Sequence, residues 1–207
     1  MLQNVIRNKD DLKDIARNNV SEIHLFFDFE GHLPEKPLNA HCAIIYEMLM
    51  FFDEETEHGK LWISYPMVEA LKHIYKDLTK CFDCIQNISD NTKYKEKVGK
   101  ISDFQDTRYY TFPDWRHIIA ANTRKAVCLV NGDYSVPAYR EASSALKQVN
   151  IFEAQKERFI LLNSSVVVLS SFPFFLLYYF GEKLYKKVHF DDFDKDCKFR
   201  HIVGKDA

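Results

Sequence analysis

The chain has 207 residues, a length that predicts one or two domains and that can bury a core without disulfides or a structural metal. Hydrophobic residues make up 46% and charged residues 28%, which is typical of a globular chain rather than a disordered one. The 28 basic and 30 acidic side chains nearly cancel, so any nucleic-acid contact needs a local basic surface. The six glycines lie too far apart for a Walker A loop or a dinucleotide fingerprint, which excludes the common ATPase, kinase and Rossmann classes.

The first half of the chain predicts alternating helices and strands. Apolar and polar side chains alternate along it in segments that we assign as a helix over 8–18, a strand over 22–29, a helix over 38–56, a strand over 61–64, a helix from Pro66 to Lys80 and a weak strand over 82–88. In the long second helix, the apolar face is expected to include Ala43, Ile44, Met48, Phe51 and Phe52. This alternation favours an α/β fold with a parallel sheet over residues 1–90.

The second half is predicted to be mainly helical. Residues 89–110 are polar and predict a loop or a short helix, and further helices are expected over 113–130, 139–150 and 151–162. We therefore interpret residues 91–160 as a helical insertion into a single domain spanning residues 1–207, with a charged tail over residues 190–207.

The stretch from Phe159 to Gly181 carries no charge and is long enough for a membrane span. Polar residues interrupt it, however, and its parts fit a buried strand over 166–169 that returns to the sheet, followed by a helix capped by Ser170 or Ser171. We prefer this strand–turn–helix to a membrane segment. The polar N-terminal residues and the five scattered cysteines favour a cytoplasmic protein without disulfides.

Two carboxylates follow the first predicted strand, at Asp28 and Glu30. Alternate residues of a strand face the same side, and two like charges at the end of a buried strand are costly unless a cation compensates them. Carboxylate oxygens suit Mg²⁺, and ligands of open α/β sheets bind at the carboxyl ends of parallel strands. In the alternative interpretation, Asp28 caps the following turn and Glu30 points into water.

A second acidic position follows the next strand. Pro66 opens the predicted helix there, Glu69 lies in its first turn, and His73 follows one turn later. The helix dipole alone favours a carboxylate at this place, so a structural role is the alternative to a functional one.

An acidic pair after a strand, followed by a helix, a strand and Pro-x-x-Glu-x-x-x-His, resembles the Toprim-like proteins of bacterial defence loci, including RloB-like and abortive-infection families. Asp28 and Glu30 match the Asp-x-Asp metal motif with Glu in second place, and Pro66, Glu69 and His73 match the second segment. The resemblance covers residues 20–75 and, loosely, 160–181.

The resemblance implies a Toprim-like sheet, a Mg²⁺ or Mn²⁺ cofactor held by Asp28 and Glu30, and Glu69 as a third catalytic carboxylate. It also implies nuclease activity in antiviral defence together with a partner ATPase of the ABC or AAA type. Toprim proteins place a further glutamate after their first strand, and the residues before Asp28 show no counterpart of that strand. A non-catalytic scaffold subunit of such a complex is therefore the alternative.

Several other patterns suggest weaker sites. Phosphate contacts are expected from the basic residues Lys93, Lys95, Lys97, Lys100, Arg124, Lys125, Lys186 and Lys187, for which a solvated surface is the alternative. Cys81 and Cys84 form a lone CxxC, which we interpret as ordinary thiols, with a zinc site that uses His73 as a third ligand, or redox activity, as the alternatives. Trp115 is interpreted as a packing anchor rather than a stacking platform, and the acidic residues of 192–196 as a solvated tail rather than a calcium loop.

Overall fold

The computed structural model of the chain describes residues 16–30, 37–75, 84–101, 103–132, 138–188 and 190. In this part of the chain the strands are β1 (His24–Asp28), β2 (Asp53–Glu54), β3 (Gly59–Ser64), β4 (Ile85–Asn87) and β5 (Ser165–Val167). They form one sheet with the order β1-β3-β2 and a separate pair, β4-β5. The chain is therefore a mixed α/β protein with small sheets.

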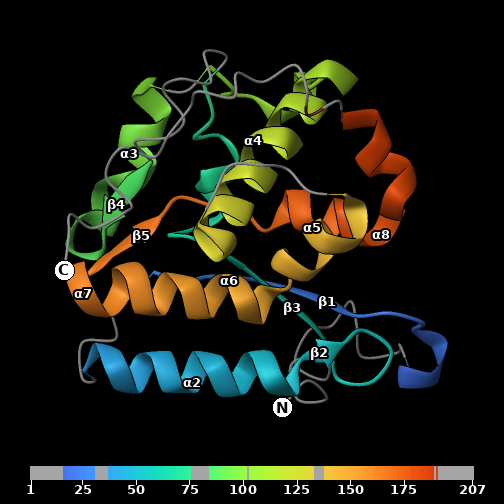
Figure 1. Cartoon of the computed structure of the whole chain (residues 1–207), viewed down its shortest axis with the longest axis horizontal. Coiled ribbons are helices and arrows are strands. Elements are labelled where there is room, and N and C mark those ends of the chain that lie inside the picture. The colour runs from blue at the N-terminus through green and yellow to red at the C-terminus, as the bar shows by residue number, and fades with distance from the viewer. Residues whose placement is uncertain are drawn as a thin grey trace.

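Helices surround these sheets (Figure 1). The α-helices are α2 (Leu38–Phe51), α3 (Asn91–Ile101), α4 (Phe112–Asn131), α5 (Tyr139–Ala145), α6 (Gln148–Gln155), α7 (Leu161–Asn163) and α8 (Phe172–Val188). A π-helical turn, η7 (Lys156–Ile160), joins α6 to α7, and short 3₁₀ turns are η2 (Arg17–Asn19), η3 (Val68–Leu71), η5 (Ile88–Asp90) and η6 (Thr107–Tyr109). Helices α2 and α6 lie side by side along one edge of the molecule, while α4 packs against α8 (Figure 1).

Strand β3 is the buried centre of the first sheet. It pairs in parallel with β1, with Asp28 opposite Ser64, and antiparallel with β2. Its residues Leu61, Trp62 and Ile63 belong to the main hydrophobic core, which also takes in buried residues of α2, α4, α6, β5 and α8. On its other side, β1 has no strand partner among the described residues.

The parallel arrangement does not extend beyond β1 and β3 in the described residues. The predicted strand around Val166 is present and buried, but β5 pairs antiparallel with β4, and an isolated antiparallel bridge between Tyr65 and Leu169 connects it to the first sheet. Because a single bridge connects the two sheets, backbone N–H and C=O groups between them need other hydrogen-bond partners.

Amide and ammonium side chains provide those partners. Gln155 donates from Nε2 to the carbonyl oxygen of Val167 at 2.7 Å and accepts from its N–H at 2.9 Å, so that its side chain replaces a neighbouring strand. The fully buried Lys125 donates to the carbonyl oxygen of Val168 at 2.7 Å, and Gln148 accepts from the N–H of Ile63 at 2.9 Å.

Two helices of the first half differ from the sequence-based expectation. Helix α2 buries Cys42, Ile45 and Leu49, whereas Ala43 and Phe51 are exposed, so the predicted apolar face was rotated about the helix axis. The helix expected from Pro66 to Lys80 is replaced by η3 and a turn up to residue 75, and residues 76–80 lie outside the described residues.

Helix α4 follows its sequence signals closely, whereas the helices expected over 139–150 and 151–162 divide earlier, between α5 and α6, and α8 continues past Gly181, where its end was predicted. Thr111 and Asp114 form a capping box at the start of α4, and Gly132 ends it in the left-handed conformation with φ 84°. Helix α8 begins after Ser171 with Pro173 in its first turn, as expected, and Gly181 kinks it with φ 61° and ψ −151°. The region 89–110 contains a full helix, α3, where a loop or short helix was predicted.

Some predictions lie outside the described residues. They are the first part of the helix over 8–18, Cys81 of the CxxC pair, and the acidic tail from residue 191 onwards. Among the described helices, none combines the length and apolar character that a membrane-spanning segment requires.

Candidate functional site

The carboxylate of Asp28 lies at the edge of the sheet where β1 and β3 both end. The parallel register brings Asp28 beside Ser64, and the backbone N–H of Val68, at the start of η3, donates to the Asp28 carboxylate. Partial burial raises the pKa of Asp28, the hydrogen bond from Val68 lowers it, and the negative charges of Glu69 and Glu30 raise it again, with a net increase. The negative charges of Glu69 and Glu30 therefore lie near enough to Asp28 to contribute to its raised pKa.

Glu30 reaches this edge in a different way from that predicted. The strand ends at Asp28, and Glu30 adopts a left-handed backbone with φ 38°, so the alternation of a strand does not orient its side chain. Its N–H donates to the carbonyl oxygen of Pro66 at 2.9 Å, and its own carbonyl oxygen accepts from Nδ2 of Asn91 at 2.5 Å. These bonds tie the residue after the strand to η3 and α3.

Glu69 is mostly buried, with 16% of its side chain exposed, and it forms an ion pair with Lys95 of α3 at 3.1 Å. The opposite end of this ion pair is exposed, since 78% of the Lys95 side chain contacts solvent. The ammonium group of Lys95 thus occupies the position beside Glu69 where a metal cation would bind.

His73 lies beyond the end of η3, so the helix that was expected to place it one turn after Glu69 is absent there. It is buried against α3, where its Nδ1 lies 2.9 Å from the hydroxyl of Tyr94. Burial, followed by the positive charges of Lys125 and Lys97, lowers the pKa of His73 to about 3, so the imidazole is neutral at pH 7.

The strand-end carboxylates are the candidate ligands for a metal ion. In the part of the chain that the structure describes, no three side chains of His, Cys, Asp or Glu lie together as a metal-binding group, and this includes His73 and Cys84. Mg²⁺, however, commonly uses one or two carboxylates and completes its shell with water and phosphate oxygens. Asp28 with Glu69 or Glu30 fits that smaller requirement.

The predicted phosphate contacts divide into two groups. Lys93, Lys95, Lys97 and Lys100 all lie on α3 with exposed side chains. Arg124 and Lys125 are buried inside α4 instead, where they bind the backbone carbonyl oxygens of Phe190 and Val168, so the prediction that they contact phosphates is wrong. They were misassigned because a helix surrounded by core on all sides can hold a cation when a carbonyl accepts from it.

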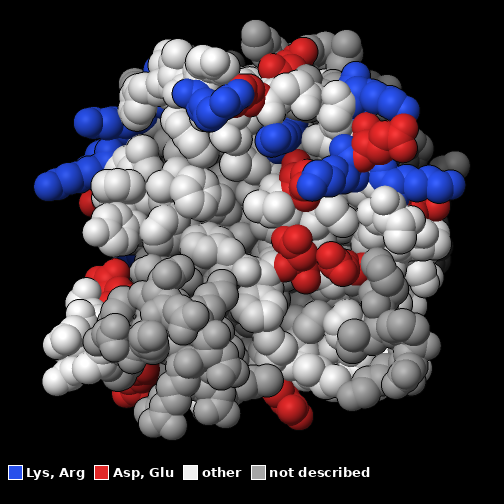
Figure 2. Space-filling view, turned by 180° about the vertical axis from the view of Figure 1, so that it is seen from behind, with Lys and Arg blue, Asp and Glu red and all other residues white. Residues whose placement is uncertain are grey.

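Three of the four lysines of α3 already form ion pairs or hydrogen bonds within the protein. Besides the Lys95 ion pair, Lys97 donates to Oε1 of Gln86 at 3.1 Å and Lys100 pairs with Glu96 one turn away. On the face shown in Figure 2, basic side chains lie in the upper half, with acidic side chains between them. The basic surface is therefore mixed with negative charge.

A pocket with a volume of about 750 Å³ opens beside Asp28, and we call it the strand-end pocket. Its polar lining comes from Asp28 and from the buried serines Ser64, Ser170 and Ser171, and its aromatic lining comes from Phe26, Phe27, Trp115 and Phe172. Sequence reasoning assigned the serines to a helix cap and Trp115 to packing. Only the folded chain brings these residues together, because they come from distant segments.

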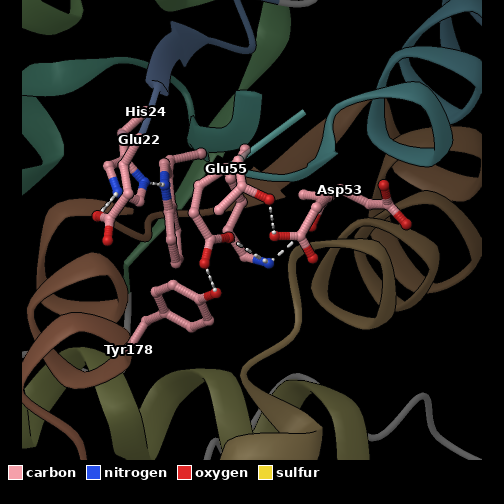
Figure 3. A network of polar contacts seen from close by, with 9 residues as sticks. Glu22, His24, Asp53, Glu55 and Tyr178 are labelled. Atoms are coloured by element: carbon pink, nitrogen blue, oxygen red, sulfur yellow. Dashed lines mark hydrogen bonds and ion pairs between the residues drawn. The ribbon is translucent and has the colours of Figure 1, made fainter. Parts of the chain in front are cut away.

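A different polar network lies at the other end of β1 (Figure 3). His24 lies 3.3 Å from Oε2 of Glu22 and accepts a hydrogen bond from Nε1 of Trp62 at 3.2 Å, while Tyr178 of α8 donates to Oε1 of Glu55 at 2.6 Å (Figure 3). These contacts connect β1, the β2–β3 turn and α8. Their positions indicate a structural role, remote from Asp28.

Comparison of the chain with protein-family models, with curated proteins and with solved structures gives no match. The strand-end carboxylates and the strand-end pocket are therefore the structural features that bear on function.

Proposed function

We propose that this protein is a metal-dependent, phosphodiester-cleaving effector with a Toprim-like core, acting with a partner ATPase in antiviral defence. The observation that carries the proposal is the meeting of Asp28, Glu69 and Glu30 charges at the shared end of β1 and β3, beside a pocket. The parallel β1–β3 pair, with α2 between the two strands in sequence, is the part of the fold that supports a Toprim-like core. The strand around Val166 was predicted to join that core over residues 160–181, but β5 pairs antiparallel with β4 instead.

In this proposal, Asp28 and Glu30 hold a Mg²⁺ or Mn²⁺ ion, and Glu69 orients a water molecule or serves as a further ligand. The ion supplies Lewis-acid chemistry, activating water and stabilising negative charge on the phosphate. The N–H of Val68 holds the Asp28 carboxylate in place at the strand end. Lys95 must then exchange Glu69 for another partner, and its exposed ammonium is suited to a phosphate oxygen.

The partner ATPase is proposed from the resemblance to Toprim-like defence proteins, and the glycines of this chain do not form a nucleotide-binding loop that would take its place. Energy-dependent control of the effector would therefore come from a second protein.

A non-catalytic scaffold subunit is the second candidate. The Lys95–Glu69 ion pair favours it, because that ion pair neutralises one of the three carboxylates without a metal. The two candidates differ in their response to divalent cations and to loss of the Asp28 charge.

The first test measures the effect of Mn²⁺ and Mg²⁺ on thermal unfolding. An ion at ten times its Kd should raise the Tm of the wild type by about 3–6 °C, because it binds the folded state alone. Asp28→Asn should lose this increase, since an amide can still accept from Val68 but lacks the ligand charge. Asp53→Asn, at the opposite end of β3, is the matched control and should respond as the wild type does.

The same three proteins and a fourth, Glu69→Gln, should then be incubated with labelled single-stranded and duplex nucleic acid and Mn²⁺. We expect cleavage by the wild type and Asp53→Asn and a loss of at least a hundredfold for Asp28→Asn, with a similar loss for Glu69→Gln. Equal Tm increases in wild type and Asp28→Asn would contradict the metal site. A metal response without cleavage, in the presence of the partner ATPase, would favour the scaffold.

A further inference from the structure

The strand-end pocket combines aromatic and hydroxyl-bearing side chains in one cavity. Phe26 is 46% exposed, although it lies on a strand beside the core, and it contacts Phe172 with ring centroids 6.0 Å apart. Trp115 lies on the other side of Phe172, at 5.7 Å. Three aromatic rings from β1, α4 and α8 thus form a continuous apolar surface along the pocket.

The buried end of the pocket is polar. Oγ of Ser64 and Oγ of Ser171 are 3.0 Å apart, and the N–H of Ser171 donates to Oγ of Ser64 at 3.2 Å. The N–H of Ser170 is bound by Oδ1 of Asn122 at 2.9 Å, whereas Oγ of Ser170 has no hydrogen-bond partner among the described residues and the residue is only 1% exposed. An unpartnered hydroxyl at this depth costs free energy unless a bound group pairs with it.

These two features match the chemistry of a nucleobase. An unstacked base presents flat faces, which stack on aromatic side chains, and edges with donors and acceptors, which hydroxyls can bind in either direction. A lipid chain would leave the hydroxyl of Ser170 unpaired, and a phosphate alone would leave the aromatic surface in water. The volume of about 750 Å³ lies within the range of pockets that hold small ligands.

We propose that the strand-end pocket binds a nucleobase of a single-stranded nucleic acid, so that the attached phosphodiester lies at the Asp28 carboxylate, which lines the same pocket. The inference rests on the proposed function, because the strand-end carboxylates identify a phosphodiester as the reacting group. It adds the substrate class: a strand whose bases are unpaired, or from which a base is displaced, rather than an intact duplex.

The test is a fluorescence titration in EDTA, where no cleavage occurs. Trp115 lines the pocket and Trp62 is buried in the core, so quenching by a bound base reports mainly on Trp115. The probes are a single-stranded oligonucleotide, an abasic oligonucleotide of the same length and charge, and the duplex of the same sequence. We expect the single strand to bind about tenfold more tightly than the abasic strand, because stacking on aromatic side chains adds affinity per base.

Phe26→Leu keeps an apolar side chain but removes one aromatic face, and it should reduce the preference for the single strand over the abasic strand by at least threefold. Phe51→Leu is the matched control, since Phe51 is 54% exposed on α2 and does not line the pocket. Circular dichroism and Tm check that both variants are folded. Ser170→Ala should change the order of affinities for the four single-stranded homopolymers, as expected for a hydroxyl that contacts the edge of a base.

Equal affinities for the abasic and normal strands, or equal effects of Phe26→Leu and Phe51→Leu, would overturn the inference. Tighter binding of the duplex would also overturn it. The outcome is separate from the test of the proposed function, because Asp28→Asn abolishes the metal response and should leave the base preference in EDTA intact. Failure of the metal response with a retained base preference would refute the proposed catalysis alone.

Discussion

His73 is a titratable residue whose protonation the fold suppresses. Its imidazole is enclosed by the hydroxyl of Tyr94, the ring of Tyr75 and the positive charges of Lys125 and Lys97. Burial is the main cause of its lowered pKa, which is about 3, against 6.5 for a solvated histidine. In the unfolded chain His73 binds a proton below pH 6.5, whereas in the folded chain it stays neutral until about pH 3.

This difference predicts a loss of stability on acidification. Between pH 6.5 and pH 3 the unfolded state binds more protons, so the free energy of unfolding falls as the pH falls. The part due to His73 amounts to at most about 2.7 kcal/mol between pH 7 and pH 4.5. His73→Gln keeps a partner for Tyr94 without titrating, and its urea midpoint should fall less over this interval. Equal falls in both proteins would mean that His73 is solvated.

At the residue scale, sequence reasoning identified the carboxylates but missed their surroundings. Asp28 was found because a charge directly after an apolar strand is unusual, and that signal is local. Lys95 beside Glu69 and Ser171 beside Ser64 carry no local signal, since the second pair is separated by 107 residues. Their contact depends on the packing of α3 and α8 against the end of the sheet. The hydrophobic periodicity of the sequence carries no information about that packing.

Gly181 determines the shape of helix α8. Its φ of 61° and ψ of −151° belong to a region that only glycine adopts readily, and it divides α8 into two helical segments of different direction. A Cβ at this position would meet the hydroxyl of Tyr139 at 3.7 Å, which is an ordinary contact. The cost of a side chain there is therefore backbone strain and not a clash.

We expect Gly181→Ala to lower the free energy of unfolding by about 1–3 kcal/mol. Gly99→Ala is the control with the opposite sign: Gly99 lies inside α3 with nothing within 4 Å of the added Cβ, and alanine there should stabilise by about 0.5–1 kcal/mol. Urea unfolding measures both. An unchanged or stabilised Gly181→Ala would show that α8 straightens without loss of packing.

For the helices and strands, the sequence predicted their presence better than it predicted which elements they pack against. Most strands and helices were placed correctly, because strand alternation and capping signals are local. The apolar face of α2 was misplaced, since this helix exposes Phe51 and Met50 as well as burying Leu49, so hydrophobicity alone does not mark its buried side. The antiparallel pairing of β5 was also missed, because strand direction is decided by the packing of α6 and α4 around it.

The whole molecule has a formal net charge of −2, so any affinity for nucleic acid depends on where its lysines lie. Two groups of exposed lysines on helices can be compared: the α3 set, Lys93, Lys97 and Lys100, which leaves out Lys95 because it pairs with Glu69, and the α8 set, Lys183, Lys186 and Lys187. Helix α3 contacts η3, which contains Glu69, and its Lys95 reaches that residue. The α3 set is therefore the one placed to hold phosphates near the strand end.

Replacing the α3 set with glutamine should weaken single-strand binding and reduce the slope of log affinity against log salt concentration by about 2, since each lost phosphate contact removes about 0.7. The same replacement of the α8 set changes the net charge equally and should leave the slope nearly unchanged. Affinity measured at several salt concentrations compares the two. A larger loss from the α8 set would place the nucleic acid on the other side of the molecule.

The separation of Ser64 from Ser171 has a consequence for the order in which the protein is made. Ser64, which lies between Asp28 and Glu69 in the chain, leaves the ribosome 107 residues before Ser171, an interval of about 5–20 s at ordinary translation rates. During that time the chain carries its carboxylates but lacks the polar end of the strand-end pocket and one of its aromatic faces. If the strand-end pocket binds a base as proposed, a nascent chain acquires the acidic residues before it can recognise a substrate, and recognition requires the start of α8.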